Sequence, residues 1–309
     1  MAIIEELGIE AKILVDGSAA TEYTPDEEPE IEGDNFGPST RVCCRYVEAI
    51  DNAHFALHAG IASVNSPGNK WLEESWENGF SFGISIDGGK TVSSQIVQQY
   101  QYDTLQGVID GQTGTIRKFR FASVSTVDDA SKNRVAKDLK AAKNLGLIRL
   151  VIRRVVVTSI TRNSASPIDT SNLANGEISL AEKALKGKAI SHGTTLSAPV
   201  RYNALFVSTS PVDPKDSPFA VFYFKYRSKE ALQQELIIPR PRSLSMESDV
   251  DNLSPEELRR LARERLSQMR GNKRSGVKAD SEEASGSSRP YKLVKIEGDK
   301  RAIDLTEDD

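Results

Sequence analysis

The chain has few of the residues from which disulfide scaffolds and zinc sites are built. Its 309 residues include two cysteines and three histidines. Cys43 and Cys44 are adjacent, and neighbouring residues of a strand point to opposite faces of a sheet. Such a pair rarely forms a disulfide, so we expect a reducing compartment, no disulfide framework and no zinc ligand set.

Long apolar runs are also missing. The longest, residues 145–160, is interrupted by Arg149, Arg153 and Arg154. The first ten residues carry three acidic side chains, no basic one and no apolar centre of a signal peptide. We therefore expect no membrane association, and a location in the nucleus or the cytoplasm.

No linear catalytic motif is present either. His54 and His58 are four residues apart and share one face of a strand or helix, but a metal site needs at least one further ligand. We predict that both are ordinary surface or half-buried histidines. His192 could pair with Ser191 or with a distant Asp, as in a hydrolase triad, yet the chain has no Gly-x-Ser-x-Gly sequence. We therefore predict no catalytic residue, no metal and no cofactor.

One glycine cluster resembles the end of a phosphate-binding loop, at Gly89-Lys90-Thr91. The glycine that such a loop needs five residues before Gly89 is replaced by Ile84. Residues 80–86 alternate strictly and lead into Asp87-Gly88-Gly89. A hairpin turn, whose positive φ angles favour glycine, accounts for these residues, so we predict a hairpin and no nucleotide site.

Alternating segments of this kind recur through the first three quarters of the chain and predict its fold. Further strands are predicted at 9–16, 41–50, 53–61, 90–94, 115–124, 147–160 and 219–226. Helical spacing predicts helices at 128–144, 177–186 and 227–238. We therefore expect a mainly β domain over residues 1–240, an antiparallel β-sandwich with a few accessory helices.

Several blocks of this domain carry a family resemblance. They are Arg45-Tyr46-Val47-Glu48-Ala49, Glu182 to Gly187 with Ser191-His192, Ser217 to Ser228, and Ile237-Ile238-Pro239-Arg240. Together they resemble an uncharacterised fungal family, a domain of unknown function, over most of residues 1–240. The resemblance implies one domain rather than two, no known activity, and a family whose members often carry charged tails.

The composition changes after Pro241 to serine and charged residues, and residues 272–290 have the composition of a disordered segment. We therefore predict a charged, largely disordered tail over residues 241–309 that contains one amphipathic helix, at residues 254–270. Ser254 and Pro255 suit the start of that helix, and a glutamate completes a capping box. Its apolar stripe consists of Leu258, Leu261, Ala262, Leu266 and Met269.

The predicted helix is rich in arginine and is followed by a basic pair. The basic residues of interest are Arg259, Arg260, Arg263, Lys273 and Arg274. They could pack on a protein partner, form a nuclear import signal, or bind nucleic acid. Glutamates dilute their charge, no aromatic residues alternate with them, and the whole chain has a net charge of −4. We rank partner packing first, import second and nucleic acid last, and do not expect a nucleic acid partner.

The most informative feature is the segment Ile303-Asp304-Leu305-Thr306-Glu307-Asp308-Asp309. This order, an apolar strand followed by acid, resembles a SUMO-interacting motif within residues 302–309. In β-augmentation an extended peptide adds a strand to a sheet edge, and alternate side chains fill pockets. Ile303 and Leu305 would share one face of that strand, and Glu307, Asp308 and Asp309 would face a basic rim.

A second signal of the same kind lies just before this motif. Val294-Lys295-Ile296-Glu297 resembles the SUMO-conjugation consensus, in which an aliphatic residue precedes the acceptor lysine and a glutamate follows. Lys295 is the first-choice acceptor, and Lys278 lies in a poorer variant with aspartate. Phosphorylation of Thr306 would add negative charge to the motif. Each pattern alone arises by chance in many proteins, but together they favour a connection to SUMO.

The sequence thus predicts a non-enzymatic, regulatory protein-interaction module for which the nucleus is favoured. Its tail would bind SUMO or SUMO-modified proteins and could itself be modified, and its β domain would bind an unidentified protein partner. One alternative is an enzyme whose site in the β domain has no linear motif, since sandwich folds host both classes. A second is a weak nucleic-acid or chromatin-associated factor that acts through the basic helix.

Overall fold

The computed structural model describes residues 1–25, 36–98, 102–128, 131–161, 170, 173, 176–187 and 189–240. In the tail it describes residues 256, 259, 260, 293–296 and 300–303. The chain forms two units, Met1–Pro241 and Arg242–Asp309.

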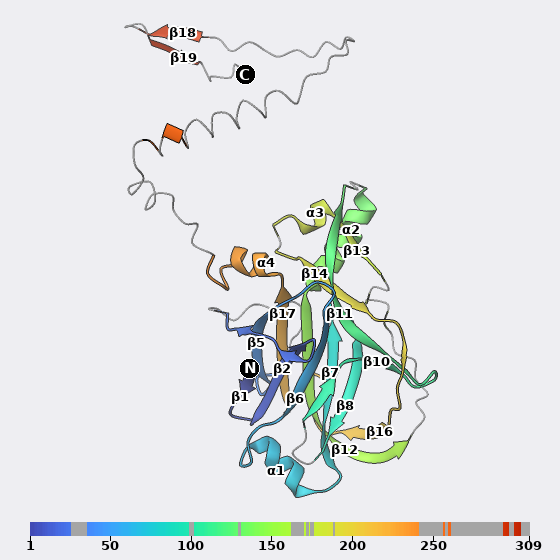
Figure 1. Ribbon diagram of the computed structural model, residues 1–309. Helices are drawn as coiled ribbons and strands as arrows, with labels where there is room; N and C mark the ends of the chain where they lie inside the picture. Colours follow the sequence, from blue (N-terminus) through green and yellow to red (C-terminus); the bar gives the residue numbers. More distant parts are fainter. Residues whose placement is uncertain are drawn as a thin grey trace. The chain divides into compact units, whose positions relative to one another are not determined.

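Two sheets make up the first unit (Figure 1). The main path of the first, ten-stranded sheet is β1 (Ala2–Ile4), β2 (Ile9–Val15), β6 (His54–Ile61), β11 (Thr115–Val127) and β10 (Gly107–Asp110). Its shorter strands are β3 (Ser18–Ala19), β9 (Asp103–Leu105), β13 (Ile178–Ala181), β14 (His192–Leu196) and β15 (Val200–Arg201).

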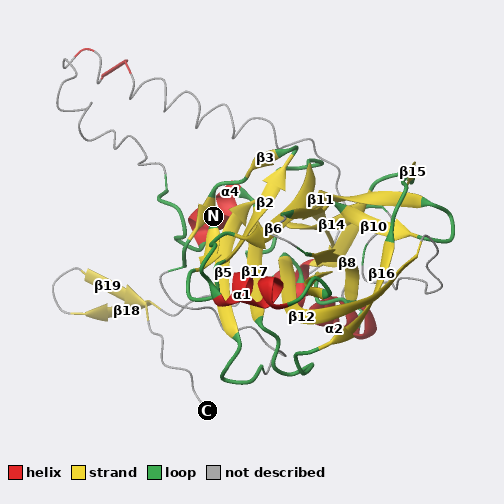
Figure 2. Ribbon diagram, turned by 90° about the horizontal axis from the view of Figure 1, so that it is seen from below, coloured by secondary structure: helices red, strands yellow, loops and turns green. Residues whose placement is uncertain are grey.

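The second, seven-stranded sheet follows the order β4 (Glu22–Tyr23), β5 (Arg41–Glu48), β17 (Ala220–Arg227), β12 (Leu147–Thr161), β7 (Asn78–Ile86) and β8 (Thr91–Val97), with β16 (Phe206–Pro211) beside β12. Two pairs are parallel, β5 with β17 and β11 with β13, and the other described pairs in both sheets are antiparallel. Figure 2 shows strands as the dominant element, with a few short helices. The prediction of a mainly antiparallel β-sandwich with a few helices is confirmed.

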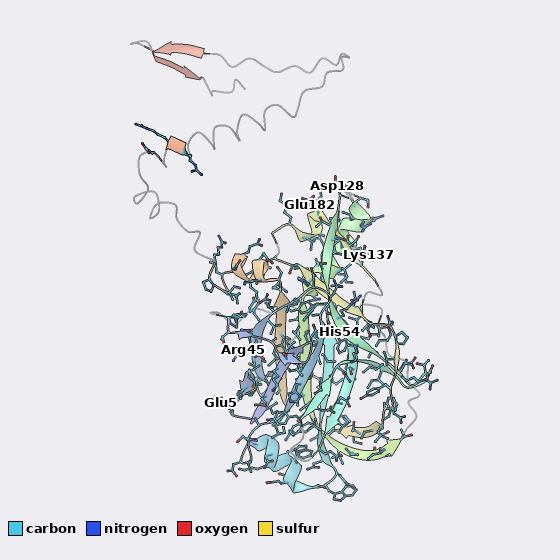
Figure 3. All side chains as sticks on the ribbon, in the orientation of Figure 1. Glu5, Arg45, His54, Asp128, Lys137 and Glu182 are labelled. Carbon is cyan, nitrogen blue, oxygen red and sulfur yellow. The ribbon has the colours of Figure 1, made fainter. Side chains whose placement is uncertain are left out.

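The two sheets enclose one apolar core, which side chains from both fill (Figure 3). Phe55 of β6 stacks on Phe121 of β11 with ring centroids 4.3 Å apart. Phe121 in turn contacts Tyr226 of β17, in the opposite sheet, at a centroid distance of 5.0 Å. The apolar positions of residues 80–86 all face this core. Burial of each such side chain stabilises the fold by about 1.5–3 kcal/mol.

β17 is buried on both faces, one against the core between the sheets and the other in a cluster that includes Phe36. Phe222 and Phe224 face the core between the sheets, whereas Val221 and Tyr223 are buried on the outer face. A strand with two covered faces needs apolar residues at successive positions rather than alternate ones. This explains why residues 219–226 form the most aromatic segment of the chain.

Cys43 and Cys44 lie side by side in β5 and point to opposite faces, as predicted. Cys43 belongs to the core between the sheets, and Cys44 packs with Tyr223 on the outer face. Neither cysteine forms a disulfide. Burial raises the pKa of Cys43, which keeps its thiol protonated and unreactive at neutral pH.

Three of the described helices follow recognisable start signals, and one of them was not predicted. α1 (Pro67–Glu74) begins after Ser66, whose hydroxyl accepts a hydrogen bond from the Asn69 amide at 3.2 Å. This Ser-Pro start matches the one predicted for the tail helix, so the signal was present in the sequence. α2 (Lys132–Asn144) and α4 (Lys229–Gln234) lie within the predicted segments 128–144 and 227–238, but both are shorter.

The helix predicted over residues 177–186 is only half correct. Ile178–Ala181 forms β13, parallel to the end of β11, and only α3 (Glu182–Leu185) is helical. The Ala181 amide donates to the Asp138 carboxylate of α2 at 2.8 Å, which fixes the point where the strand ends. Pairing with a neighbouring strand therefore outweighs the local helical pattern.

The predicted hairpin between β7 and β8 is confirmed, with positive φ at Asp87 (53°) and at Gly88 (74°). The Asp87 side chain turns inward from this turn. Its carboxylate accepts hydrogen bonds from the Gly146 amide at 2.8 Å, the Thr194 amide at 2.9 Å and the Tyr226 hydroxyl at 2.7 Å. One turn residue thereby joins the two sheets at this end of the sandwich.

In the tail, Glu256, Arg259 and Arg260 are helical, within the predicted helix 254–270. The rest of that helix and residues 272–290 lie outside the described residues. β18 (Leu293–Ile296) and β19 (Lys300–Ile303) form an antiparallel hairpin that was not predicted. Its signal was present, because two segments containing β-branched residues flank a glycine. No described helix has the length and apolarity needed to cross a membrane.

Candidate functional site

The first part of the proposed SUMO-interacting motif lies in an extended strand. Ile303 is the last residue of β19 and is paired with Leu293 of β18. Among the described residues, β19 pairs with β18 alone, which leaves the backbone groups of its other edge to a further strand. Asp304, Leu305, Thr306, Glu307, Asp308 and Asp309 lie outside the described residues.

The first-choice acceptor lysine lies in the same hairpin as Ile303. Lys295 is in the middle of β18, opposite Arg301 of β19. The two SUMO-type signals therefore occupy the two strands of one hairpin, a relationship that the sequence analysis did not anticipate. Lys278, the poorer acceptor, lies outside the described residues.

The basic segment is described at two of its five positions. Arg259 and Arg260 are helical and exposed. Arg263, Lys273 and Arg274 lie outside the described residues. The two described arginines are therefore available to a partner, but their positions do not distinguish protein packing from an import signal.

His54 and His58 have the ordinary environments that were predicted for them. His54 opens β6 and is exposed (Figure 3). His58 is half-buried, its ring stacks on Tyr102 at 5.1 Å, and its Nδ1 lies 2.9 Å from the Thr104 hydroxyl. Burial, then the charge of Lys12, lowers the pKa of His58, so the ring is neutral at pH 7. The described residues contain no group of three or more potential metal ligands.

His192, by contrast, has a serine and a distant aspartate as partners, as a hydrolase triad would. Its Nδ1 lies 2.9 Å from the Ser191 hydroxyl, and its Nε2 lies 2.9 Å from Asp51 Oδ1. The His192 side chain is 6% exposed and the Asp51 side chain 59%. The Ser228 amide also donates to the Ser191 hydroxyl, at 2.7 Å. We call Ser191, His192 and Asp51 the Ser–His–Asp chain.

Three separate segments bring the Ser–His–Asp chain together. Asp51 lies in the turn between β5 and β6, beside Asn52 with its φ of 61°. His192 is the first residue of β14, Ser191 directly precedes it, and Ser228 is the residue that caps α4. The Ser–His–Asp chain therefore lies at the rim of the sandwich, where loops of both sheets meet, and not in the apolar core.

A family comparison covers nearly the whole first unit. Residues 8–241 match the model of a family described as Domain of unknown function (DUF7918). The chain belongs to this family. The match confirms the prediction of one domain of unknown function over most of residues 1–240. No curated protein and no solved structure matches the chain.

The DUF7918 domain also has two described surface cavities. One, of about 430 Å³, lies beside the β10–β11 hairpin and is lined by residues that include Asp110, Thr115 and Arg117. The other, of about 380 Å³, lies between β1 and β5 and is lined in part by Glu6 and Arg41, which form an ion pair at 2.6 Å. Neither lining includes a member of the Ser–His–Asp chain.

Proposed function

We propose that this chain is a regulatory protein-interaction module. In this proposal the DUF7918 domain binds an unidentified protein partner, and the tail binds SUMO or SUMO-modified proteins. The observation that carries the proposal is the order of residues 303–309, an apolar strand followed by acid, whose first residue has extended backbone. A nuclear location and a fungal origin belong to the same proposal.

β-Augmentation is the mode of binding that this segment favours. The added strand gains main-chain hydrogen bonds along its whole length, and alternate side chains give specificity. Ile303 and Leu305 are the alternate apolar residues, and the edge of β19 away from β18, which pairs with no other described strand, offers the backbone groups. A strand that is already paired on one side loses less conformational entropy on binding than a free peptide does.

The acidic residues add electrostatic attraction to a basic rim on the partner. Glu307, Asp308 and Asp309 follow the apolar pair directly. Exposed charges of this kind are screened by salt, with a Debye length of about 10 Å at 0.1 M and 3 Å at 1 M. The proposed complex should therefore weaken at high ionic strength.

Conjugation of SUMO to Lys295 is proposed as a second role of the same hairpin. Lys295 and Ile303 lie in neighbouring strands of one hairpin. One SUMO molecule attached to Lys295 would have little freedom to reach the motif without strain. We therefore propose that the motif recruits a SUMO-charged conjugating complex in trans.

The basic helix would serve a partner or an import receptor. Arg259 and Arg260 are exposed on the described part of the helix. The adjacent glutamate at position 256 is exposed too, so the surface has mixed charge rather than a uniform basic face. Mixed charge favours protein packing over binding to a phosphate backbone, which depends on the number of phosphates neutralised.

The test is a titration of isotope-labelled SUMO with the full-length chain, followed by NMR. The proposal predicts shift perturbations along one sheet edge of SUMO, and their loss in the double variant Ile303→Ala/Leu305→Ala. The matched control is Leu258→Ala/Leu261→Ala, which removes two leucines from the predicted helix and leaves the motif intact. Unchanged perturbations in the first variant would show that residues 303–309 are a chance acidic segment.

A further inference from the structure

With a neutral imidazole, the hydrogen bonds of the Ser–His–Asp chain have one consistent set of directions. The Asp51 carboxylate can only accept, so His192 Nε2 carries the proton and donates it. In a neutral ring Nδ1 is then an acceptor, and the Ser191 hydroxyl donates to it. The Ser191 oxygen in turn accepts from the Ser228 amide. The proton of Ser191 thus points at a base whose opposite side is held by a carboxylate.

This arrangement has the roles that nucleophilic catalysis requires. A serine is activated when an adjacent imidazole can take its proton and a third group orients that imidazole. The 2.9 Å distances from His192 to Ser191 and to Asp51 lie within the range for such contacts. The Ser228 amide donates to the same Ser191 oxygen and so fixes the position of the hydroxyl beside His192.

We propose that Ser191 is an activated nucleophile, with His192 as its general base and Asp51 as the residue that orients His192, and that it accepts acyl groups from small activated esters. This assigns an activity to the DUF7918 domain beyond partner binding. A substrate would reach Ser191 from the rim of the sandwich, because Ser191 is half-buried and Asp51 lies in an exposed turn.

The chemistry balances with water as the only co-reactant. The Ser191 oxygen forms a bond to the ester carbonyl carbon while its proton moves to His192 Nδ1. The bond from that carbon to the leaving alcohol then breaks, and the alcohol leaves with the proton from Nδ1. Water adds to the resulting ester of Ser191 with His192 again as base, and the carboxylic acid and the free serine are released.

The electrostatic surroundings of His192 suit a base at neutral pH. Burial lowers its pKa, against the opposing effect of the Asp51 carboxylate, which is hydrogen-bonded to the ring, and of the charge of Glu230. A neutral imidazole is the form that can accept the serine proton. Reactivity of Ser191 should therefore be full near pH 8 and fall as the pH drops through the pKa of His192, which lies below its usual 6.5.

The proposal is tested by treating the full-length protein with a fluorescent alkyl fluorophosphonate, in which the serine oxygen displaces fluoride from phosphorus. Mass spectrometry should place a single adduct on Ser191. Asp51→Asn should slow labelling at least about tenfold, because the ring is no longer held in the reactive tautomer. The rate at which the wild type is labelled should fall as the pH drops through the pKa of His192.

Ser197 is the matched internal control. Its hydroxyl also accepts from a backbone amide, that of Lys118 at 2.9 Å, but its own partner is the Ala198 carbonyl and not an imidazole. Ser197 should therefore stay unlabelled, and Ser197→Ala should leave labelling of Ser191 unchanged. The adduct is mapped on the wild type, so the test holds even if Ser191→Ala fails to fold. Absence of an adduct, or equal labelling of Ser191 and Ser197, would show that the Ser–His–Asp chain only joins three segments.

Discussion

The hydroxyl of Tyr226 in β17 donates a 2.7 Å hydrogen bond to the carboxylate of Asp87, in the turn between β7 and β8. Tyr226 lies in β17, an interior strand of the seven-stranded sheet, and is completely buried. Asp87 belongs to a hairpin turn, so its backbone is partly exposed while its carboxylate points inward. Thr194 of the first sheet contacts both residues, through its amide to Asp87 and its hydroxyl to Tyr226 at 3.0 Å. At this point polar groups join the two sheets, in addition to the apolar packing of the core.

Removal of the Tyr226 hydroxyl should destabilise the domain moderately. In Tyr226→Phe the ring keeps its packing, but Asp87 loses one donor and the Thr194 hydroxyl loses its partner. We expect a loss of about 1–3 kcal/mol in the free energy of unfolding, because buried polar groups are left unsatisfied. Urea denaturation measures it. Tyr202→Phe, a half-buried tyrosine outside this network, is the control and should change stability by less than about 0.5 kcal/mol.

The same carboxylate gives a prediction for pH. Burial raises the pKa of Asp87 above its usual 3.8, against the opposing hydrogen bonds from Tyr226 and three backbone amides. As pH falls, the folded protein therefore binds this proton before the unfolded chain does, and the contribution of Asp87 to stability grows between its raised pKa and 3.8. As pH rises through the raised pKa, that contribution is lost.

Comparison with Asp87→Asn isolates this contribution, since asparagine does not titrate. The difference in unfolding free energy between wild type and variant should become larger in favour of the wild type as the pH is lowered from 7 to 4. Urea denaturation at several pH values measures the difference. A difference that stays constant over this range would contradict a raised pKa.

Arg154 should not be replaceable by lysine. Its guanidinium donates to Asp213 Oδ1 at 2.9 and 2.6 Å and lies over the rings of Trp71 and Phe219, at 5.6 and 5.4 Å. Lysine cannot form the two-pronged contact or stack its flat face on a ring. Arg154→Lys should cost about 1–3 kcal/mol in the free energy of unfolding.

The neighbouring arginine provides the control for that prediction. Arg153 donates from one nitrogen to the Lys215 carbonyl at 3.0 Å, and no aromatic ring of the described part of the chain contacts it as Trp71 and Phe219 contact Arg154. Arg153→Lys should therefore cost less than Arg154→Lys in the same thermal or urea melt. Equal losses would show that the stacking and the two-pronged contact add nothing specific.

Local patterns predicted most of the fold because strands and turns are encoded locally. The alternation of residues 80–86 and the following Asp-Gly-Gly gave the β7–β8 hairpin correctly. The error at 178–181 arose because that segment is a strand only through its pairing with β11. Local helical spacing could not reveal that partner.

The Ser–His–Asp chain could not be predicted because it depends on long-range contacts. Asp51 and His192 are 141 positions apart, and no local sequence connects them. The neighbouring Ser191 was visible, but serine next to histidine is not diagnostic by itself. The tail motif shows the opposite case: its residue order was recognised directly, whereas the hairpin that pairs Ile303 with Leu293 was not.

Phosphorylation of Thr306 should strengthen the proposed binding to SUMO. A phosphate adds a charge of about −1.5 to −2 between the apolar pair and the acidic residues, next to the basic rim of the partner. Exposed charge pairs contribute about 0.2–1 kcal/mol each, so the gain should be roughly twofold to fivefold in affinity at low salt.

The measurement is a calorimetric titration of SUMO with the phosphorylated and unphosphorylated full-length chain, at about 0.1 M and 1 M salt. Thr306→Ala, treated with the same kinase, controls for modification at other sites. The gain should shrink at the higher salt, because screening acts on exposed charges and not on the apolar contacts of Ile303 and Leu305. An equal affinity of both forms at low salt would mean that no basic surface faces Thr306 in the complex.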